Sequence, residues 1–525
     1  MKNIFKIIFL ITTLGMISAC EKFLDLKPEN FLSPVNYFNT EEQLNFALNG
    51  VYDILGKGPL YGNLIPVNMA TEADEGFYAR QTTVSGPTVF NFSSSDANIL
   101  NLWTNLYDGI NRANVVLVNV DNAKIDEVKR GFIIGEALFL RAYYYFLLVI
   151  NWGDVPLLLQ PTSSAIGNNV QRTSVEEIYE QIIKDMETAE GLVRTAQDAG
   201  FGGRINKSAV RGILARVNLH WAGYPVRNLS RYAEALKWTK KIIDDKESQH
   251  KLNPSYEQIF INYAQDKYDI AESIWEVEFW GNGIGSAFNE HGQIGSWIGI
   301  TTLNPSIGTA YGFINATYRH YLRYDTDDLR RDYAIAPFRY EGTTTNKIYF
   351  EEKDKYVRNV GKWRRENETL TPKGYHNTPQ NYPLLRYADV LLMFAEADNV
   401  INSGPSVEAY RAINQVRRRA YGISLDAISS EIDFKNMDQG TFLAAIQEER
   451  SRELCFEGLR KHDLIRWGIL IPTLKQVASE VNANAENNMK YAALRFNNVS
   501  TRHLLLPIPE SELALNNLLT QNPEW

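Results

Sequence analysis

The chain has 525 residues, of which 44% are hydrophobic and 22% are charged, and its formal net charge at pH 7 is −8. This length is sufficient for a large hydrophobic core, and the acidic balance disfavours nucleic acid as a partner. Only two cysteines occur, Cys20 and Cys455, which excludes a disulfide-rich secreted scaffold.

The N-terminus has the pattern of a bacterial export signal over residues 1–19. A basic start with Lys2 and Lys6 precedes an apolar run over residues 7–14, and small residues lead into Cys20. The apolar run is too short for a membrane-spanning helix, which needs about 20 residues. Cleavage before a cysteine leaves a thiol for diacylglyceryl attachment. We therefore expect a lipoprotein signal with lipidation at Cys20; an ordinary secretory signal followed by a chance cysteine is the alternative.

Beyond the signal, apolar residues recur mostly at helical spacing. Thr40 and Gln43 form a capping-box pattern that opens a helix through Leu55, and Gly56 follows it. The spacing predicts further helices over residues 99–120, 127–150, 174–192, 206–222, 230–245, 383–402, 406–420 and 440–459. Several are neighbours in the chain, which indicates tetratricopeptide-like stacking of helix pairs, although the full repeat consensus is absent.

The stretch over residues 246–382 differs in kind. It contains an alternating segment over residues 274–279, typical of a short strand, followed by many glycines interleaved with aromatic residues. We predict an irregular lobe laid against the helices, which is a usual place for a binding surface. The predicted fold is thus a mostly α single domain over residues 20–525, with a helical scaffold over about 40–245 and 383–525 and a loop-rich lobe with short strands over about 246–382.

Catalytic and metal-binding signatures are absent from the sequence. The seven histidines are scattered, with no HExxH motif, and there is no nucleophile elbow, P-loop or dinucleotide fingerprint. We therefore expect no metal, no cofactor and no enzymatic activity. A glycosidase needs only two carboxylates, such as Asp74 and Glu75 or Asp327 and Asp328, but adjacent acids of this kind are usually solvated loop residues.

Several blocks, read together in chain order, resemble one known family. They are Cys20–Leu26, Gly135–Phe146 with Trp152–Leu157, Leu385–Ala397, Ile413–Arg417, Glu448–Gly458 with Asp463–Gly468, and Leu506–Pro509. These blocks are similar to those of the SusD/RagB family, the surface glycan-binding lipoproteins that partner TonB-dependent outer-membrane transporters.

The resemblance implies a function as well as a fold. We expect a lipid-anchored, cell-surface protein of the outer membrane that captures an oligo- or polysaccharide and delivers it to a TonB-dependent (SusC-like) transporter. Peptide capture, which some relatives perform, is one alternative, and a structural transporter lid with negligible ligand affinity is another.

Charged residues in these blocks have structural interpretations. They lie on predicted helices with apolar neighbours, where long charged side chains commonly form ion pairs. Because a buried charge must be paired, we expect scaffold roles for Arg386, Asp389, Glu396, Glu449, Arg450, Arg452, Glu453 and Arg466.

Sugar binding needs flat aromatic faces and planar polar side chains. Trp280, Trp297 and Tyr311 are the best aromatic candidates, since glycine or polar residues flank each of them in the loop-rich stretch. Each could instead be a partly buried loop anchor. Asn289 and Gln293 are weaker candidates for polar contacts.

The resemblance adds three further candidates. The family's known site is similar to the neighbourhood of Asp74, Arg80 and Trp103 in this sequence. Glycine-flanked tryptophans in a polar loop region are costly to expose unless a ligand covers them. We therefore expect Trp103, Trp280 and Trp297 to converge on one shallow site that binds an oligosaccharide by stacking.

Overall fold

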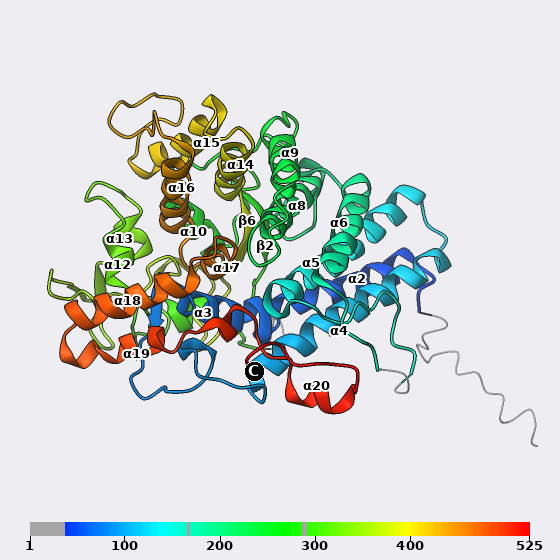
Figure 1. The fold of residues 1–525 in the computed structure, drawn as a ribbon, viewed down its shortest axis with the longest axis horizontal. Coiled ribbons are helices and arrows are strands. Elements are labelled where there is room, and N and C mark those ends of the chain that lie inside the picture. The colour runs from blue at the N-terminus through cyan, green and yellow to red at the C-terminus, as the bar shows by residue number, and fades with distance from the viewer. Residues whose placement is uncertain (1–36, 165–168, 286–290) are drawn as a thin grey trace, which may run out of the picture.

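The computed structural model describes residues 37–164, 169–285 and 291–525. The expected signal over residues 1–19, the lipidation at Cys20 and the candidate Asn289 lie outside the described residues. The fold is mostly α-helical with a few short strands (Figure 1), which confirms the predicted class.

The N-terminal part of the scaffold begins with the predicted capped helix. The Thr40 side chain accepts a hydrogen bond from the backbone N–H of Gln43 at 3.2 Å, and the helix then ends at Gly56. The helices up to residue 243 are α2 (Glu41–Gly56), the π-helical turn η1 (Gly58–Gly62), α3 (Leu64–Thr71), the short 3-10 turn η2 (Pro87–Val89), α4 (Ala97–Asn119), the short 3-10 turn η3 (Val120–Asn122), α5 (Glu127–Trp152), α6 (Val175–Leu192), α7 (Ala196–Ala199), α8 (Lys207–Ala222) and α9 (Arg231–Ile243).

The C-terminal part contains a strand where the sequence predicted only helix. The pattern over 383–402 predicted one helix, but β6 (Tyr382–Arg386) pairs with an antiparallel strand of the lobe before the helix begins at Tyr387. The partner strand lies more than 100 residues earlier, so local periodicity could not reveal it. The helices are α14 (Tyr387–Ile401), α15 (Val407–Ala420), α16 (Gln439–Leu454), α17 (Arg460–Arg466), α18 (Leu470–Asn484), α19 (Tyr491–Asn497) and α20 (Glu510–Leu515).

The helices form one continuous stack. α5 packs against both α4 and α6, and α8 packs against α6 and α9. α9 packs against α14, the first helix after the lobe, and so joins the N-terminal helices to the C-terminal ones (Figure 1). The helix pairs that are separated in sequence are therefore neighbours in space. One described helix, α5, is long and apolar enough to cross a membrane, but 83% of its most apolar stretch is buried, as in the core helix of a globular domain.

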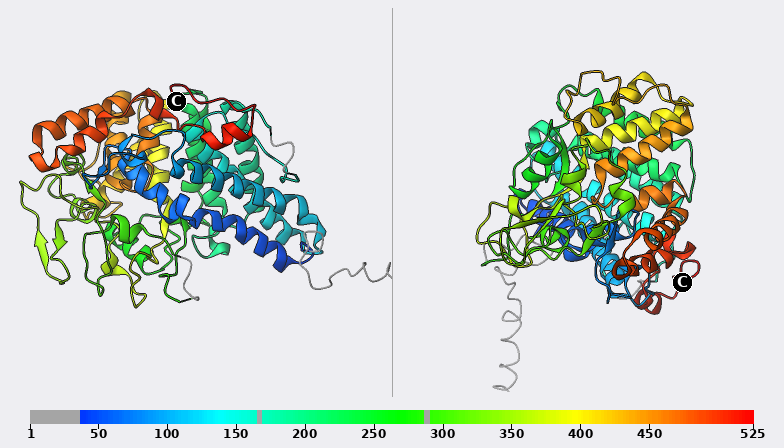
Figure 2. Two further views of the ribbon diagram at one scale, coloured as in Figure 1. Left: turned by 90° about the horizontal axis from the view of Figure 1, so that it is seen from below. Right: turned by 90° about the vertical axis from the view of Figure 1, so that its left-hand side faces the viewer.

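The segment between α9 and β6 is built of short elements and loops. Figure 2 shows it gathered on one side of the helices. The strands form three two-stranded antiparallel sheets, β1 with β3, β2 with β6, and β4 with β5. The short elements, with β1 from the preceding scaffold, are β1 (Gly76–Tyr78), α10 (Tyr256–Ala264), β2 (Ser273–Val277), α11 (Ile294–Ile298), β3 (Ile314–Ala316), α12 (Tyr318–Tyr321), α13 (Arg331–Ala334), β4 (Phe338–Tyr340) and β5 (Lys347–Tyr349).

Ion pairs join the scaffold to the lobe, as the motif charges predicted. Arg386 binds Glu272 at 3.0 Å, Glu453 at 2.9 Å and Glu457 at 2.8 Å, all with side chains at most 3% exposed. Each of the eight motif charges forms an ion pair, some across to the lobe and some within the scaffold, which confirms their scaffold roles. The pairs fix the packing of β6, α14, α16 and α17.

Candidate functional site

Aromatic side chains gather around Phe313, at the end of a loop that precedes β3. Tyr311 and Tyr78 stack on Phe313 with ring centroids 5.2 and 5.5 Å away, and Trp297 meets it edge-on at 5.1 Å. His376 in turn stacks on Tyr311 at 5.7 Å. We call this set the Phe313 cluster: Tyr78, Trp297, Tyr311, Phe313, Tyr375 and His376.

Backbone hydrogen bonds bring these rings together from three parts of the chain. The N–H of Ala79 donates to the carbonyl of Phe313 at 2.7 Å, which continues the β1–β3 pairing and sets Tyr78 beside Phe313. The N–H of Phe313 donates to the carbonyl of Trp297 at 2.8 Å. Gly312 lies between the two stacked rings with φ of +55°, and a Cβ there would lie 2.1 Å from Thr301 Oγ1, so only glycine fits.

Arg80 is the charged member of the site. Its guanidinium carbon lies 4.5 Å from the centroid of the Phe313 ring, and its Nη2 donates to the carbonyl of Tyr311 at 2.6 Å. The backbone carbonyl of Arg80 accepts a hydrogen bond from Arg495 of α19 at 2.5 Å. The guanidinium therefore holds one face of the cluster by a cation–π contact.

A buried ion pair supports the two loops that carry the outer rings. Arg365 binds Glu368 at 3.0 Å, and its Nη1 donates to the carbonyls of Thr309 at 2.7 Å and of Tyr375 at 3.5 Å. A single guanidinium thus ties the loop that leads to Tyr311 to the loop that carries Tyr375. The outer rings are accessible: the Tyr375 side chain is 61% exposed.

The hydroxyl groups in the cluster are available as hydrogen-bond partners. Tyr311 Oη lies 3.1 Å from Nδ1 of His376. Burial and the neighbouring Tyr375 raise the pKa of Tyr311 to about 12, so its hydroxyl stays protonated at neutral pH. Flat ring faces beside a guanidinium, hydroxyls and an imidazole are the groups that bind pyranose rings.

Two of the sequence-predicted residues, Trp297 and Tyr311, belong to this cluster, and a third, Arg80, contacts it. The sequence did not single out Tyr78, Phe313, Tyr375 and His376. One local signal was present, because Tyr311 and Phe313 flank a glycine and so present neighbouring rings. For Tyr375 and His376 the sequence offers no comparable signal, because it is Arg365 that holds their loop close to Tyr311.

Two predicted contacts are corrected by burial. The Trp103 side chain is 3% exposed and packs edge-on against Trp152 at 5.3 Å, so it belongs to the core of the scaffold. Asp74 is fully buried and binds Arg323 at 2.6 Å and Arg460 at 2.8 Å. Burial alone would raise the pKa of Asp74, but the two arginines outweigh it and hold the pKa well below its usual range.

Of the remaining predicted residues, Gln293 lies beside the cluster and Trp280 lies apart from it. Gln293 accepts a hydrogen bond from Asn63 at 2.8 Å and donates to Asn377 at 3.5 Å. Trp280 is 46% exposed, and it lines a cleft formed with α2 and residues 201–204. The expected convergence of Trp103, Trp280 and Trp297 on one site is thus wrong for Trp103, and Trp280 belongs to a different hollow from the Phe313 cluster.

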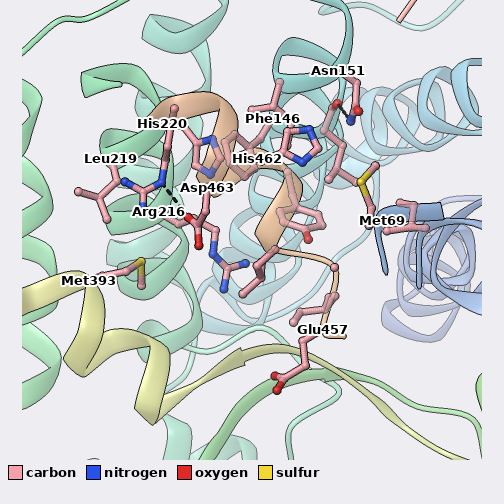
Figure 3. A pocket seen from close by; sticks show the side chains of 18 of the residues that line it. Met69, Phe146, Asn151, Arg216, Leu219, His220, Met393, Glu457, His462 and Asp463 are labelled. Atoms are coloured by element: carbon pink, nitrogen blue, oxygen red, sulfur yellow. Dashed lines mark hydrogen bonds and ion pairs between the residues drawn. The ribbon is translucent and has the colours of Figure 1, made fainter. Parts of the chain in front are cut away.

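A small cavity lies inside the scaffold, between α5, α8 and α17 (Figure 3). Its volume is about 50 Å³, room for a few water molecules, since each needs at least about 10–15 Å³. Arg216 Nε, Asn151 Oδ1 and His462 Nε2 in its wall have no hydrogen-bond partner among the described residues. Burial lowers the pKa of His220 and that of His462, so both imidazoles are neutral at pH 7. The cavity is too small for a sugar ring.

Within the described parts of the chain, no group of three or more His, Cys, Asp or Glu side chains is placed to hold a metal ion.

Two family models match the chain. The SusD family matches residues 321–525, and the family described as starch-binding associating with outer membrane matches residues 22–219. Among curated proteins, the chain is 27% identical to SusD-like protein P25 of Formosa agariphila, with 99% of this chain and 98% of that protein covered.

Solved structures agree with this result. A SusD homologue from Bacteroides thetaiotaomicron superposes with a TM-score of 0.86 at 29% identity, covering 94% of this chain and 98% of that one. Surface glycan-binding protein A from the same organism, in complex with laminarihexaose, superposes with a TM-score of 0.69 at 21% identity, covering 92% and 100%. The latter similarity establishes the shared fold.

Proposed function

Because this chain belongs to the SusD/RagB family, we propose that it captures a glycan on the Phe313 cluster and performs no catalysis of its own. The observation that carries the proposal is the cluster itself: stacked rings, partly exposed, beside a guanidinium, a tyrosine hydroxyl and an imidazole. Aromatic faces contact the C–H-rich faces of pyranose rings, and planar polar groups bind pairs of hydroxyls. Relatives named for binding glycans, one of them in complex with laminarihexaose, support this class of ligand.

The proposal includes the place of action and the partner. We propose a lipid anchor at Cys20 on the outer-membrane surface, and delivery of the glycan to a TonB-dependent transporter. The description of one matching family as associating with the outer membrane supports this location. Loss of acyl-chain labelling in a Cys20→Ser variant would test the anchor, and co-purification of the transporter from solubilised outer membranes would test the partner.

The test of glycan capture is direct binding. The wild type and the Trp297→Ala and Tyr311→Ala variants would be applied to an array of defined plant, microbial and host oligosaccharides, followed by calorimetry on those that bind. Each lost ring should weaken binding several-fold to about tenfold, because a stacked aromatic contributes about 0.5–1.5 kcal/mol. Tyr349→Ala is the matched control, since Tyr349 is a 66% exposed aromatic of the same lobe outside the cluster.

The outcomes separate the alternatives. Binding of a glycan that both variants weaken and the control leaves unchanged supports capture at the cluster. Binding that neither variant changes would place the site elsewhere. If no glycan binds, the proposal of glycan capture is replaced by peptide capture or by a transporter lid without ligand affinity. Release of reducing ends on incubation with a polysaccharide would instead show that the protein is a hydrolase.

A further inference from the structure

The charges beside the Phe313 cluster indicate which kind of glycan it binds. Arg80 donates its hydrogen bonds to backbone carbonyls, those of Ala79 at 2.8 Å, Tyr311 at 2.6 Å and Gly312 at 3.5 Å. Over the described ranges 37–164, 169–285 and 291–525, no carboxylate forms an ion pair with it. Carbonyl oxygens carry only partial charges, so the Arg80 guanidinium keeps a net positive charge.

A neighbouring arginine is in the same state. Arg495 of α19 is 5% exposed, and it donates to the carbonyls of Thr83 at 3.0 Å and of Arg80 at 2.5 Å. Its Nε has no hydrogen-bond partner, and no carboxylate pairs with it, among the residues that the structure describes. Buried arginines of the scaffold, such as Arg386 and Arg450, bind carboxylates instead. Because buried charges are normally paired, the two guanidinium groups leave a local excess of positive charge.

Two tyrosines beside these guanidinium groups respond to the same charge. Burial raises the pKa of Tyr78 and that of Tyr491, and the charged groups that oppose this rise are Arg80 and Arg495. No carboxylate of the described part of the chain contributes to either shift. The electrostatic environment on this side of the cluster is therefore positive.

The other side of the cluster is close to neutral. Arg365 binds Glu368 at 3.0 Å, so each neutralises the other. Burial lowers the pKa of Lys373, on the loop that carries Tyr375, and the carboxylates of Glu368 and Glu366 oppose this. The excess of positive charge therefore belongs to the two unpaired guanidinium groups.

Arg80 also has donors left for a ligand. A guanidinium has five N–H donors, and carbonyls take three of them here. The side chain is only half-buried, and its Nε makes no hydrogen bond to a described residue. Arginine binds carboxylates and tetrahedral oxyanions through paired N–H···O bonds, which are about twice as strong as bonds between neutral groups. Because the guanidinium carbon lies 4.5 Å from the centroid of Phe313, a sugar stacked on the cluster would place its substituents near these donors.

The acidic balance of the whole chain does not prevent an anion from binding. The formal net charge is −8, but exposed charges more than about 8 Å apart are largely screened at physiological ionic strength. The local excess of positive charge therefore decides which charge the cluster attracts.

We propose that the Phe313 cluster selects glycans that carry anionic groups, either carboxylates or sulfate esters, and that Arg80 binds the anionic group. This inference rests on the proposed function and names the class of glycan. The rings supply affinity for the sugar faces, and the guanidinium supplies the preference for charge. An anion bound at Arg80 would also offset the unpaired charge of Arg495.

The test is an array of gluco-, galacto- and xylo-configured oligosaccharides, in which neutral members are matched in length with uronate-containing and sulfated members. The full chain should bind the anionic members more tightly than the neutral ones. Arg80→Gln should lower the ratio of anionic to neutral affinity about tenfold, because it removes a charge-assisted hydrogen bond. Arg80→Lys keeps the charge and should retain most of the ratio. Stronger binding of the uronate or of the sulfated members identifies the anionic group.

Two measurements guard against an indirect effect of the substitution. Arg339→Gln is the matched control, since Arg339 is an exposed arginine of the same lobe, in β4, and its loss changes the net charge equally. It should leave the ratio unchanged. With the wild type alone, raising the ionic strength from about 0.01 to about 1 M shortens the Debye length from about 30 to about 3 Å. This should weaken the anionic members several-fold and leave the neutral members nearly unchanged.

Each result decides the question. A charge preference that Arg80→Gln removes and Arg339→Gln preserves supports the inference. If Trp297→Ala weakens binding but neutral and anionic members bind equally at every ionic strength, the inference is refuted while capture at the Phe313 cluster stands. If the wild type binds glutamate-rich peptides and no oligosaccharide, the inference and glycan capture fail together. Circular dichroism of each variant confirms that it is folded.

Discussion

The scaffold and the loop-rich lobe use polar and aromatic side chains in opposite ways. In α14, α16 and α17, most charged residues are buried and every one of the motif charges is paired, as Glu453 is with Arg330, Arg386 and Arg419. In the lobe, aromatic rings such as Tyr375 stand at the surface on loops held by Arg365. The comparison teaches that the family's signature residues build the frame, whereas the groups that would meet a ligand lie outside the signature.

The largest expected effect comes from breaking the frame. Glu453→Gln leaves three buried guanidinium groups without the carboxylate that they share, and removing one partner of a buried ion pair costs about 3–5 kcal/mol. Urea unfolding followed by circular dichroism should show a loss of stability of that size. The control is Glu41→Gln, which removes an exposed ion pair with Lys129 and should cost much less, because solvent screens an exposed pair. Equal losses of unfolding free energy in the two variants would contradict the difference between buried and exposed ion pairs.

A buried carboxyl without a cation behaves differently from the paired ones. Glu276 accepts hydrogen bonds from Ser273 at 2.5 Å and from Asn381 at 3.0 Å, and burial raises its pKa to about 7. A carboxyl whose pKa is higher in the folded protein than in the unfolded chain contributes most to stability at a pH where it is protonated in both the folded and the unfolded state. That contribution is complete below the ordinary pKa of about 4.5 and is lost as the pH rises through about 7.

Glu276→Gln should therefore flatten the pH dependence of stability between pH 4.5 and 7. At pH 8 the variant should be more stable than the wild type by on the order of 2 kcal/mol, because the amide carries no charge to bury. At pH 4.5 the two proteins should be similar. Unfolding curves at several pH values measure this, with Glu352→Gln at an exposed position as the control. A constant difference at all pH values would show that Glu276 does not titrate in this range.

The contrast between scaffold and lobe also explains which features could be predicted from the sequence. Helical periodicity located α4, α5, α6 and α8 within a few residues, because an amphipathic stripe is a local property. Asp74 and Arg80 lie six residues apart in similar loop sequence, yet one is buried and the other joins the Phe313 cluster. Asp74 is buried by Arg323 and Arg460, which are hundreds of residues away in the chain, and no local pattern records such a contact.

Aromatic residues show the same limit. Trp103 and Trp297 both appeared to be exposed candidates, but Trp103 packs against Trp152 of the neighbouring helix α5 and Trp297 packs against Phe313. The family resemblance could not separate core rings from surface rings. That separation depends on which helices pack together.

The smallest expected effect tests the surface side of the comparison. Tyr375→Ala removes a ring that is 61% exposed and that contacts Tyr311 at 6.3 Å and His376 at 4.6 Å. Substitutions at exposed positions usually change stability by no more than about 0.5 kcal/mol, so unfolding should be nearly unchanged. Glycan affinity should fall by about 0.5–1.5 kcal/mol, which calorimetry resolves as a loss of about two- to tenfold. Tyr349→Ala, at a comparably exposed position outside the cluster, should change neither quantity. If Tyr375→Ala lowered stability and left affinity unchanged, Tyr375 would be a frame residue like Glu453, and the division between frame and surface would not hold in this loop.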